Sequence, residues 1–448
     1  MTGERYVLLG LATARAGWFA DVSRWATSGA LPAEFIKALS AEEVSARLRA
    51  GRRFSALVVD ASVRGWDRDL IELAAAQGCA VVVVDDHSPP RAWHELGANA
   101  VLAADFGRDL LLETLRGVAQ TVARADEAEP IGRTGSPTPA PWRGRLVALT
   151  GAGGVGRSTL AMALADGLAT DPRNRGSVLL ADMALDAQQG LLHDAGDVVP
   201  GLSELVEAHR RTALPVSEVR RLCFVLMDRG YDLLLGLRRH RDWTALRPHA
   251  VAAAIAGLQS AYRIVVAEVD ADVEGETETG SIDIEERNQL ARSCVTHADL
   301  VVVVGHAGMS GLHRQIRVLG DMIRLGVPTE RILPVVNRVP RSPRRRSEIG
   351  AAMSELLSDT APGTVLSAGP AYVPERRRLD DLIADNDRAP VSLADAMTSA
   401  VKVLLERTDD RRAGSLVSSY GGPASEHPVP VAPGSLGSWG ETEGQQTP

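Results

Sequence analysis

The chain has 448 residues, enough for roughly two or three domains with sizeable cores. Hydrophobic residues make up 45% and charged residues 24%, and this ordinary balance excludes a wholly disordered chain. A net charge of −8 and an aromatic content of 4% argue against a general nucleic-acid binder and against a protein that stacks single-stranded bases. Cys79, Cys223 and Cys294 have neither disulfide nor zinc spacing, as expected of a protein from a reducing cytosol.

Residues 1–123 alternate apolar strands with helices, and this alternation predicts a parallel sheet that is covered on both faces. We expect a buried strand rather than a secretory signal near the N-terminus, because Arg15 follows the apolar stretch closely. No apolar run reaches the roughly 18–20 residues of a spanning helix, so the sequence predicts a cytoplasmic protein. The predicted strands lie at 6–13, 54–62, 79–86 and 98–104, and the predicted helices at 41–51 and 107–125.

Residues 124–143 are rich in Pro, Gly and acidic side chains, a composition that favours an interdomain linker. Residues 144–407 form the second predicted α/β domain, whose final amphipathic helix at 392–407 we expect to pack on the core. Residues 408–448 lack apolar periodicity and are predicted to be a disordered tail. The predicted strands of the second domain are 145–150, 177–182, 262–268, 299–305 and 331–337.

A Gly-rich loop follows the first strand of the second domain and precedes an Ala/Leu-rich helix. Gly151, Gly156, Arg157 and Ser158 have the spacing G-x-x-x-x-G-K-[ST], with Arg in place of Lys. Glycines let backbone N–H groups turn inward toward an anion, and the helix N-terminus adds partial positive charge. The Ser158 hydroxyl stands where a Mg²⁺ ligand is needed. The order of strand, loop and helix therefore predicts a phosphate-binding loop rather than a chance glycine turn.

Arg157 affects what such a loop can do. Arginine keeps the charge and binds phosphate well, but it is bulkier than the lysine that reaches the β- and γ-phosphates. Because the only lysines are Lys37 and Lys402, a bias toward arginine offers a simpler explanation for this residue. We expect the loop to bind a nucleotide but not to hydrolyse it efficiently.

The loop at 152–159 resembles the KGGxGK[ST]T loop of the MinD/ParA group of dimerising P-loop ATPases. The glycine pair and Ser158-Thr159 match that loop, whereas Ala152 replaces the lysine that crosses the dimer interface in this family. An ordered series of further matches extends the resemblance over roughly residues 144–405. The resemblance implies a mainly parallel sheet, a homodimer, and ATP with Mg²⁺ as ligands.

Other positions of the family pattern follow along the chain. Asp182 matches the first aspartate of a D-x-D motif, and Ala184 stands where the family positions the attacking water. Glu268 stands where the Walker B strand usually carries Asp, and Asn337 matches the amide that reads the base. The resemblance implies catalytic roles for Arg157 and Asp182, Mg²⁺ ligation through Ser158, Asp182 and Glu268, and nucleotide binding by Gly151, Gly153, Gly154, Val155, Gly156, Arg157, Ser158, Thr159, Asn337 and Arg338.

Simpler interpretations exist for two of these acids. Asp182 could merely end a strand. Glu268 could be one more charge in the acidic stretch 268–286, which is more typical of a solvated loop than of a metal site. The histidines have no zinc-site spacing, so no metal other than nucleotide-bound Mg²⁺ is expected.

The first domain resembles a response-regulator receiver domain, with Asp60 at the strand end where a receiver accepts phosphate. The acidic pair expected after the first strand is missing, and Ala104 replaces the expected lysine, so phosphotransfer to Asp60 is not expected. A pseudo-receiver joined to a deviant MinD-like domain resembles the CpaE/TadZ localisation factors and the septum-site determining (Ssd) proteins. This resemblance implies a spatial regulator that recruits Tad-type pilus, secretion or division machinery at a cell pole or septum.

Two other functions remain open. A nucleotide-free scaffold would keep the fold for protein contacts alone. A ParA-like DNA-partitioning ATPase would use arginine clusters to contact phosphates, although such clusters are more often solvated faces. The clusters are residues 338–346, 220–221 and 375–378.

Overall fold

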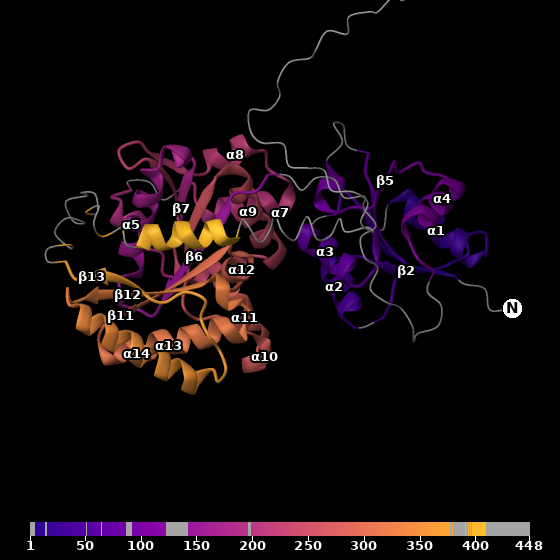
Figure 1. Ribbon diagram of the computed structural model, residues 1–448. Coiled ribbons are helices and arrows are strands. Elements are labelled where there is room, and N and C mark those ends of the chain that lie inside the picture. The colour runs from indigo at the N-terminus through magenta and orange to yellow at the C-terminus, as the bar shows by residue number, and fades with distance from the viewer. Residues whose placement is uncertain are drawn as a thin grey trace, which may run out of the picture. The chain divides into compact units, whose positions relative to one another are not determined.

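The computed structural model describes residues 5–121, 142–376 and 397–408, apart from 14–15, 51, 64, 87–91 and 196–198, together with residues 379, 390, 393 and 395. Most of the predicted linker and nearly all of the predicted tail lie outside the described residues. The first compact unit of the chain, Met1–Leu405, contains two β-sheets (Figure 1). The predicted domain limits stay a prediction.

The first sheet has five parallel strands in the order β2-β1-β3-β4-β5, which is the flavodoxin-like order of a doubly wound sheet. Four of these strands confirm the sequence prediction, and β2 was not predicted. The strands are β1 (Tyr6–Leu11), β2 (Ala33–Ala38), β3 (Ala56–Asp60), β4 (Ala80–Val84) and β5 (Ala100–Leu102).

Helices cover both faces of the first sheet. Buried residues of α1 (Gly17–Thr27) and α4 (Arg108–Val118) share one apolar core, and those of α2 (Ala41–Arg49) and α3 (Arg68–Ala76) share the other. The second core also contains Trp93, whose ring is stacked on Trp66 with 4.7 Å between the ring centroids. The inner strands β1, β3 and β4 are almost wholly apolar because both of their faces are buried.

The second sheet has eight strands in the order β13-β12-β11-β6-β10-β7-β9-β8, and only the edge pair β8–β9 is antiparallel. The mainly parallel α/β fold predicted from the sequence is thus confirmed, and β8, β9 and β13 are additions to it. The strands are β6 (Arg145–Gly151), β7 (Val178–Asp182), β8 (Phe224–Leu226), β9 (Tyr231–Leu234), β10 (Ile264–Glu268), β11 (Leu300–His306), β12 (Ile332–Val339) and β13 (Ala371–Pro374).

Two apolar cores lie on opposite faces of this sheet. One contains α5 (Arg157–Ala169) together with Met397, Val401 and Leu404, so the C-terminal helix packs on the core as predicted (Figure 1). The other core is built from five longer helices. These are α7 (Leu202–Arg211), α9 (Pro248–Ala261), α12 (Gln289–His297), α13 (Met309–Arg324) and α14 (Pro343–Thr360). Short helices α6 (Gln189–Leu192), α8 (Val216–Arg221), α10 (Glu276–Thr279) and α11 (Ile282–Arg287) connect these elements.

The register of the central strands sets the position of the site. In β10, Glu268 lies opposite Asp182 of β7 and Leu149 of β6. Because the strands are parallel, their carboxyl ends lie at one edge of the sheet, where ligands of such folds bind. The two acids that the sequence predicts as neighbours therefore meet at the end of β6, next to the Gly-rich loop.

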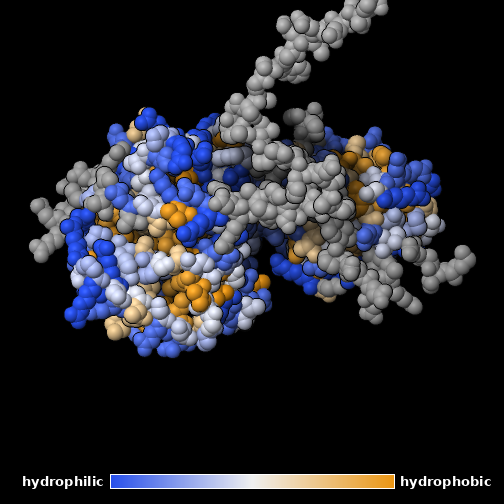
Figure 2. Space-filling view, in the orientation of Figure 1, coloured by the Kyte–Doolittle hydropathy of each residue, from blue (hydrophilic) through white to orange (hydrophobic). Residues whose placement is uncertain are grey.

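The visible surface is mainly hydrophilic, with separate apolar patches (Figure 2). Among the described residues, Leu191, Met227 and Val365 have some of the most exposed large apolar side chains. Apolar side chains that are scattered in this way are normal for a protein surface and indicate no particular partner. Within the described ranges, no helix is both long and apolar enough to cross a bilayer.

Candidate functional site

The loop between β6 and α5 has the backbone conformation that the glycine spacing predicts. Gly154 and Gly156 have φ values of +81° and +87°, in the left-handed region that glycine adopts at little cost. A Cβ on Gly151 would lie 2.5 Å from the carbonyl oxygen of Val304. Left-handed turns at the start of a helix direct backbone N–H groups toward an anion, and the α5 N-terminus adds its dipole.

A cavity of about 600 Å³ lies against this loop, and its size is that of a small-molecule site. Of the residues predicted to bind nucleotide, only Val155 and Asn337 are missing from its lining. The cavity is also lined by side chains from other elements, such as His240, Asp270 and Arg287, which were not predicted from the sequence. The lining comprises Gly151, Ala152, Gly153, Gly154, Gly156, Arg157, Ser158, Thr159, Leu185, Asp186, Gln188, Leu192, His240, Asp270, Ala271, Asp272, Arg287, Asn288 and Arg338.

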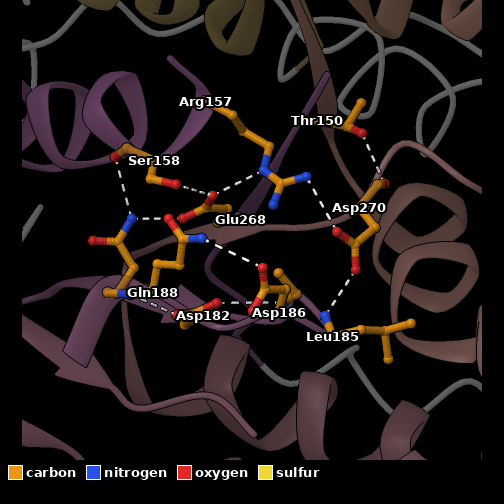
Figure 3. Close-up of polar contacts among 11 residues, drawn as sticks. Thr150, Arg157, Ser158, Asp182, Leu185, Asp186, Gln188, Glu268 and Asp270 are labelled. Carbon is orange, nitrogen blue, oxygen red and sulfur yellow. Dashed lines mark hydrogen bonds and ion pairs between the residues drawn. The ribbon is translucent and has the colours of Figure 1, made fainter. Parts of the chain in front are cut away.

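The side chain of Arg157 is directed toward carboxylates (Figure 3). Its Nε donates to Glu268 Oε1 at 2.8 Å, and its Nη1 donates to Asp270 Oδ1 at 3.3 Å. Burial lowers the pKa of the guanidinium, but the charges of Glu268 and Asp270 outweigh burial and raise this pKa above its ordinary value. Arg157 therefore remains a cation that is held within the protein.

Glu268 is the centre of this hydrogen-bond network. The residue is 1% exposed, and besides Arg157 it accepts hydrogen bonds from Ser158 Oγ at 2.6 Å and from Gln189 Nε2 at 2.6 Å. Gln189 belongs to the short helix α6 and also donates to the carbonyl oxygen of Ser158 at 3.2 Å. Glu268 is therefore not a charge on a solvated loop, and it joins α5 to the segment after β7.

Asp182 is fully buried beneath this segment. Its oxygens accept the backbone N–H groups of Gln189 at 2.8 Å and Ala184 at 3.3 Å. Burial first, and then the negative charge of Glu268, raise the pKa of Asp182 to about 7, against these two hydrogen bonds. Asp182 does not line the cavity, so its predicted catalytic role stays a prediction.

Asp270 is a member of the site that the sequence analysis did not predict. Its Oδ2 accepts the backbone N–H of Leu185 at 2.7 Å, and its carbonyl oxygen accepts the Thr150 hydroxyl at 2.8 Å. The acidic stretch that follows is also more ordered than the solvated loop we expected, since it includes α10 and α11. A usable signal was present in the sequence, because Asp270 follows the end of β10 at the sheet edge that also carries Asp182.

Asn337 lies beneath the loop rather than in the cavity. Its side-chain Nδ2 donates to the carbonyl oxygen of Val155 at 2.9 Å, and its Oδ1 accepts the backbone N–H of Arg338 at 2.8 Å. Arg338 has a φ of +55°, and it lines the cavity. Asn337 therefore fixes the loop in this structure, and its predicted contact with a base stays a prediction.

The two predicted ligands fit the site differently. The left-handed glycines, the helix N-terminus and the adjoining cavity suit the phosphates of a nucleotide. The carboxylates predicted to support Mg²⁺ accept hydrogen bonds from protein donors on both of their oxygens. No cluster of three or more His, Cys, Asp or Glu side chains suited to a metal occurs in the part of the chain that the structure describes.

Several arginines of the predicted basic clusters have partners within the protein. Arg344 and Arg345 both pair with Glu348 at 2.9 Å. Arg220 donates to the carbonyl oxygen of Ala261 at 2.7 Å. Part of the cluster at 375–378 lies outside the described residues. Glu348 offsets part of the charge of Arg344 and Arg345, and the Arg220 guanidinium is held by a backbone carbonyl.

Asp60 of the first sheet is held by neighbouring side chains. Its Oδ2 accepts the indole N–H of Trp18 at 3.1 Å, and its Oδ1 accepts the Ser62 hydroxyl at 2.5 Å. These bonds give Asp60 a structural role at the end of β3. The interpretation of this sheet as a receiver-like domain stays a prediction.

No protein-family model and no curated protein matches the chain. Solved structures resemble part of it. A ParA family ATPase from Chlorobium tepidum is 18% identical, with 59% of this chain and 96% of that chain covered and a TM-score of 0.41. The MinC:MinD cell division complex from Aquifex aeolicus is 18% identical, with 64% and 100% covered and a TM-score of 0.40. The cell division ATPase MinD from Pyrococcus furiosus is 17% identical, with 60% and 99% covered and a TM-score of 0.42.

Proposed function

We propose that this chain binds ATP in the cavity beside residues 151–159 and acts as a spatial regulator of the MinD/ParA type. The observation that carries this proposal is the backbone of the loop: two left-handed glycines lead into the N-terminus of α5 beside a cavity of about 600 Å³. Backbone N–H groups and a helix dipole at such a place favour a polyphosphate. Ser158 and Thr159 supply hydroxyl groups there, and Arg338 lies on the cavity wall.

We propose that hydrolysis is slow or absent. The cavity wall carries Ala152 where the resemblance implies a lysine, and the buried Ala184 stands where it implies the group that positions water. A methyl group can neither stabilise developing charge nor orient a water molecule. ATP would thus serve as a conformational ligand.

Equilibrium dialysis of the full chain with radiolabelled ATP tests the proposal. We expect saturable uptake that weakens at least about tenfold in Arg157→Ala, because a charge-assisted contact to phosphate is lost. Arg344→Ala on the exposed face of α14 is the control, and its uptake should remain unchanged. Phosphate release from the pure protein should stay near background, and rapid release would contradict slow hydrolysis.

The larger role is proposed from the same resemblance. A homodimer that forms with ATP would recruit secretion, pilus or division proteins to a pole or septum, in the manner of the CpaE/TadZ and Ssd proteins. Light scattering with and without ATP tests the dimer, and immunogold labelling of cells tests the location. A monomer under both conditions, or uniform labelling, would count against this role.

A nucleotide-free scaffold is the second candidate. It is favoured by the ion pairs of Arg157 with Glu268 and Asp270, which neutralise much of the charge beside the loop within the protein itself. The same dialysis experiment discriminates between the two functions. Absence of uptake at millimolar ATP would favour the scaffold. A ParA-like partitioning role would instead require ATP-dependent and salt-sensitive retention on duplex DNA.

A further inference from the structure

The guanidinium of Arg157 lies where three carboxylates converge at the edge of the second sheet (Figure 3). It contacts Glu268 and Asp270 directly, and its charge also lowers the pKa of the nearby Asp182. The Arg157 side chain is only 16% exposed, so water screens these interactions weakly. A protein cation thus contacts Glu268 and lies near Asp182, the two acids that were predicted from the sequence to support Mg²⁺.

The carboxylate oxygens of this acidic cluster are already occupied by hydrogen bonds from the protein. All six carboxylate oxygens of Asp182, Glu268 and Asp270 accept a hydrogen bond from the protein. The donors are the backbone N–H groups of Ala184, Gln189 and Leu185 and the side chains of Arg157, Ser158 and Gln189. Mg²⁺ demands near-octahedral oxygen ligands at roughly 2.0–2.1 Å. To bind these carboxylates, the ion would have to displace donors that are already in place.

Two positions at which this chain departs from the pattern of the MinD/ParA loop and Walker B strand are in contact with each other. Arg157 stands in place of Lys and Glu268 in place of Asp, and they meet at 2.8 Å. Glutamate is one methylene longer than aspartate, which lets its carboxylate reach both Arg157 and Ser158. Arginine offers several donors in one plane, so it can hold two carboxylates at once, whereas lysine is a single point charge. Arg157 and Glu268 therefore form a matched ion pair.

The same guanidinium can also serve a phosphate. Arg157 lines the cavity, and its Nη2 makes no hydrogen bond to any residue that the structure describes. Guanidinium N–H groups bind phosphate oxygens strongly. Arg157 can thus bridge the buried acids and an anion above them.

We propose that this chain binds the phosphates of its nucleotide without a divalent cation, and that Arg157 supplies the positive charge. The inference rests on the proposed function, because it requires a nucleotide in the cavity. It goes beyond that function because it predicts that ATP binds without the Mg²⁺ that the resemblance implies.

The test compares the ATP dissociation constant of the full chain in excess Mg²⁺ with that in EDTA, by isothermal titration calorimetry. We expect the dissociation constant in EDTA to be no more than about twofold higher than that in excess Mg²⁺. The double variant Arg157→Lys/Glu268→Asp removes the matched ion pair and should bind at least about tenfold more weakly in EDTA than in Mg²⁺. Arg344→Lys/Glu348→Asp makes the same two changes in an exposed ion pair on α14 and should behave like the unmodified chain.

The possible results separate the two proposals. Binding by the unmodified chain that weakens at least about tenfold in EDTA overturns the metal-free inference and leaves nucleotide binding intact. No ATP binding under either condition overturns the proposed function, and the inference with it. Because the central comparison uses the unmodified chain, the inference stays testable even if the double variant fails to fold.

Discussion

Gly153 and Gly156 belong to the same loop but have different surroundings. Gly156 has a φ of +87°, and a Cβ there would lie 2.6 Å from Asn337 Nδ2. Around Gly153 a Cβ would meet nothing within 4 Å, and its φ is not in the left-handed region. The requirement for glycine at Gly156 thus comes from both backbone conformation and packing, whereas Gly153 is open toward the cavity.

Gly156→Ala should therefore lower the free energy of unfolding by about 1–3 kcal/mol, the cost of holding a residue with a side chain in a left-handed conformation. Gly153→Ala, the matched control, should change this free energy by less than about 0.5 kcal/mol. Urea unfolding followed by far-ultraviolet circular dichroism measures both changes. Equal destabilisation by the two variants would refute this view of the loop.

Asp182 gives the second sheet a pH-dependent stability. In the unfolded chain an aspartate has a pKa of about 3.9, whereas burial and Glu268 raise the pKa of Asp182 to about 7 in the folded protein. Between these values the folded chain keeps a proton that the unfolded chain has released. The contribution of Asp182 to the free energy of unfolding must then fall as the pH rises through this window, and level off above it.

Asp182→Asn removes the titrating group. The stability of this variant relative to the unmodified chain should rise between pH 4 and pH 7, on the order of 1 kcal/mol for each pH unit. Asp186→Asn makes the same change in an exposed aspartate nearby and serves as the matched control. Urea midpoints at four or five pH values give the comparison. Parallel curves for Asp182→Asn and the unmodified chain would show that Asp182 is ionised in the folded protein.

The sequence predicted which residues surround the loop better than it predicted their contacts. The glycine spacing indicated the backbone, and the strand ends placed Asp182 and Glu268 at one edge. The direction of the Arg157 side chain could not be predicted, because it depends on Asp270, a residue hidden in a run of acids that resembled a solvated loop. Asn337 was assigned to a base by resemblance, whereas its contact with Val155 depends on how closely β12 approaches the loop.

At the level of elements, α6 is fixed to the site by one residue. The Gln189 side chain is fully buried and donates to the Ser158 carbonyl oxygen and to Glu268 Oε2. Its neighbour Gln188 has an exposed side chain, with a contact to Asp186 at 3.4 Å. The position of α6 relative to α5 therefore depends on Gln189, although both residues are glutamines.

We expect Gln189→Ala to lower the free energy of unfolding by about 1–3 kcal/mol, because buried acceptors lose their donor. Gln188→Ala should cost less than about 0.5 kcal/mol. Urea unfolding distinguishes them, and hydrogen exchange of amides in α6 should rise only in the first variant. A neutral Gln189→Ala would mean that α6 is held by its backbone contacts alone.

Three of the four strands that the sequence failed to predict, β2, β8 and β13, lie at sheet edges, and the fourth, β9, pairs with the edge strand β8. β2 has an exposed or half-buried residue at most of its positions. Central strands such as β4 and β11 are continuous apolar runs because both faces are covered, which makes them easy to recognise. A strand at a sheet edge can contain polar residues, so its own sequence gives little sign that it pairs with a neighbouring strand.

At the level of the whole molecule, the apolar cores are separate. The two cores of the first sheet contain only residues between Tyr6 and Ala119, and those of the second sheet only residues from Leu146 onward. Each sheet therefore buries its apolar side chains against helices of its own part of the chain. The division near residues 124–143, whose composition indicated a linker, stays a prediction.

Brief trypsin digestion should cut the folded chain at Arg124 or Arg133 and release two resistant fragments. Mass spectrometry identifies the cut sites, and circular dichroism of the separated fragments reports whether each keeps its secondary structure. The fragment that begins after the cut should still take up ATP in dialysis. Loss of structure in either fragment on separation would show that the two sheets depend on each other.

The tryptophans give the molecule an optical asymmetry. Of the seven in the chain, Trp18, Trp25, Trp66 and Trp93 belong to the first sheet and its helices, and Trp66 stacks on Trp93. Intrinsic fluorescence should therefore report mostly on that half, through an emission maximum that shifts to the red when these indoles meet water. Trp142 is exposed and Trp243 packs, partly buried, against one core of the second sheet, so unfolding of that sheet should shift the emission less. Tryptophan emission and far-ultraviolet circular dichroism, recorded on the same sample, could thus follow the unfolding of the two sheets separately.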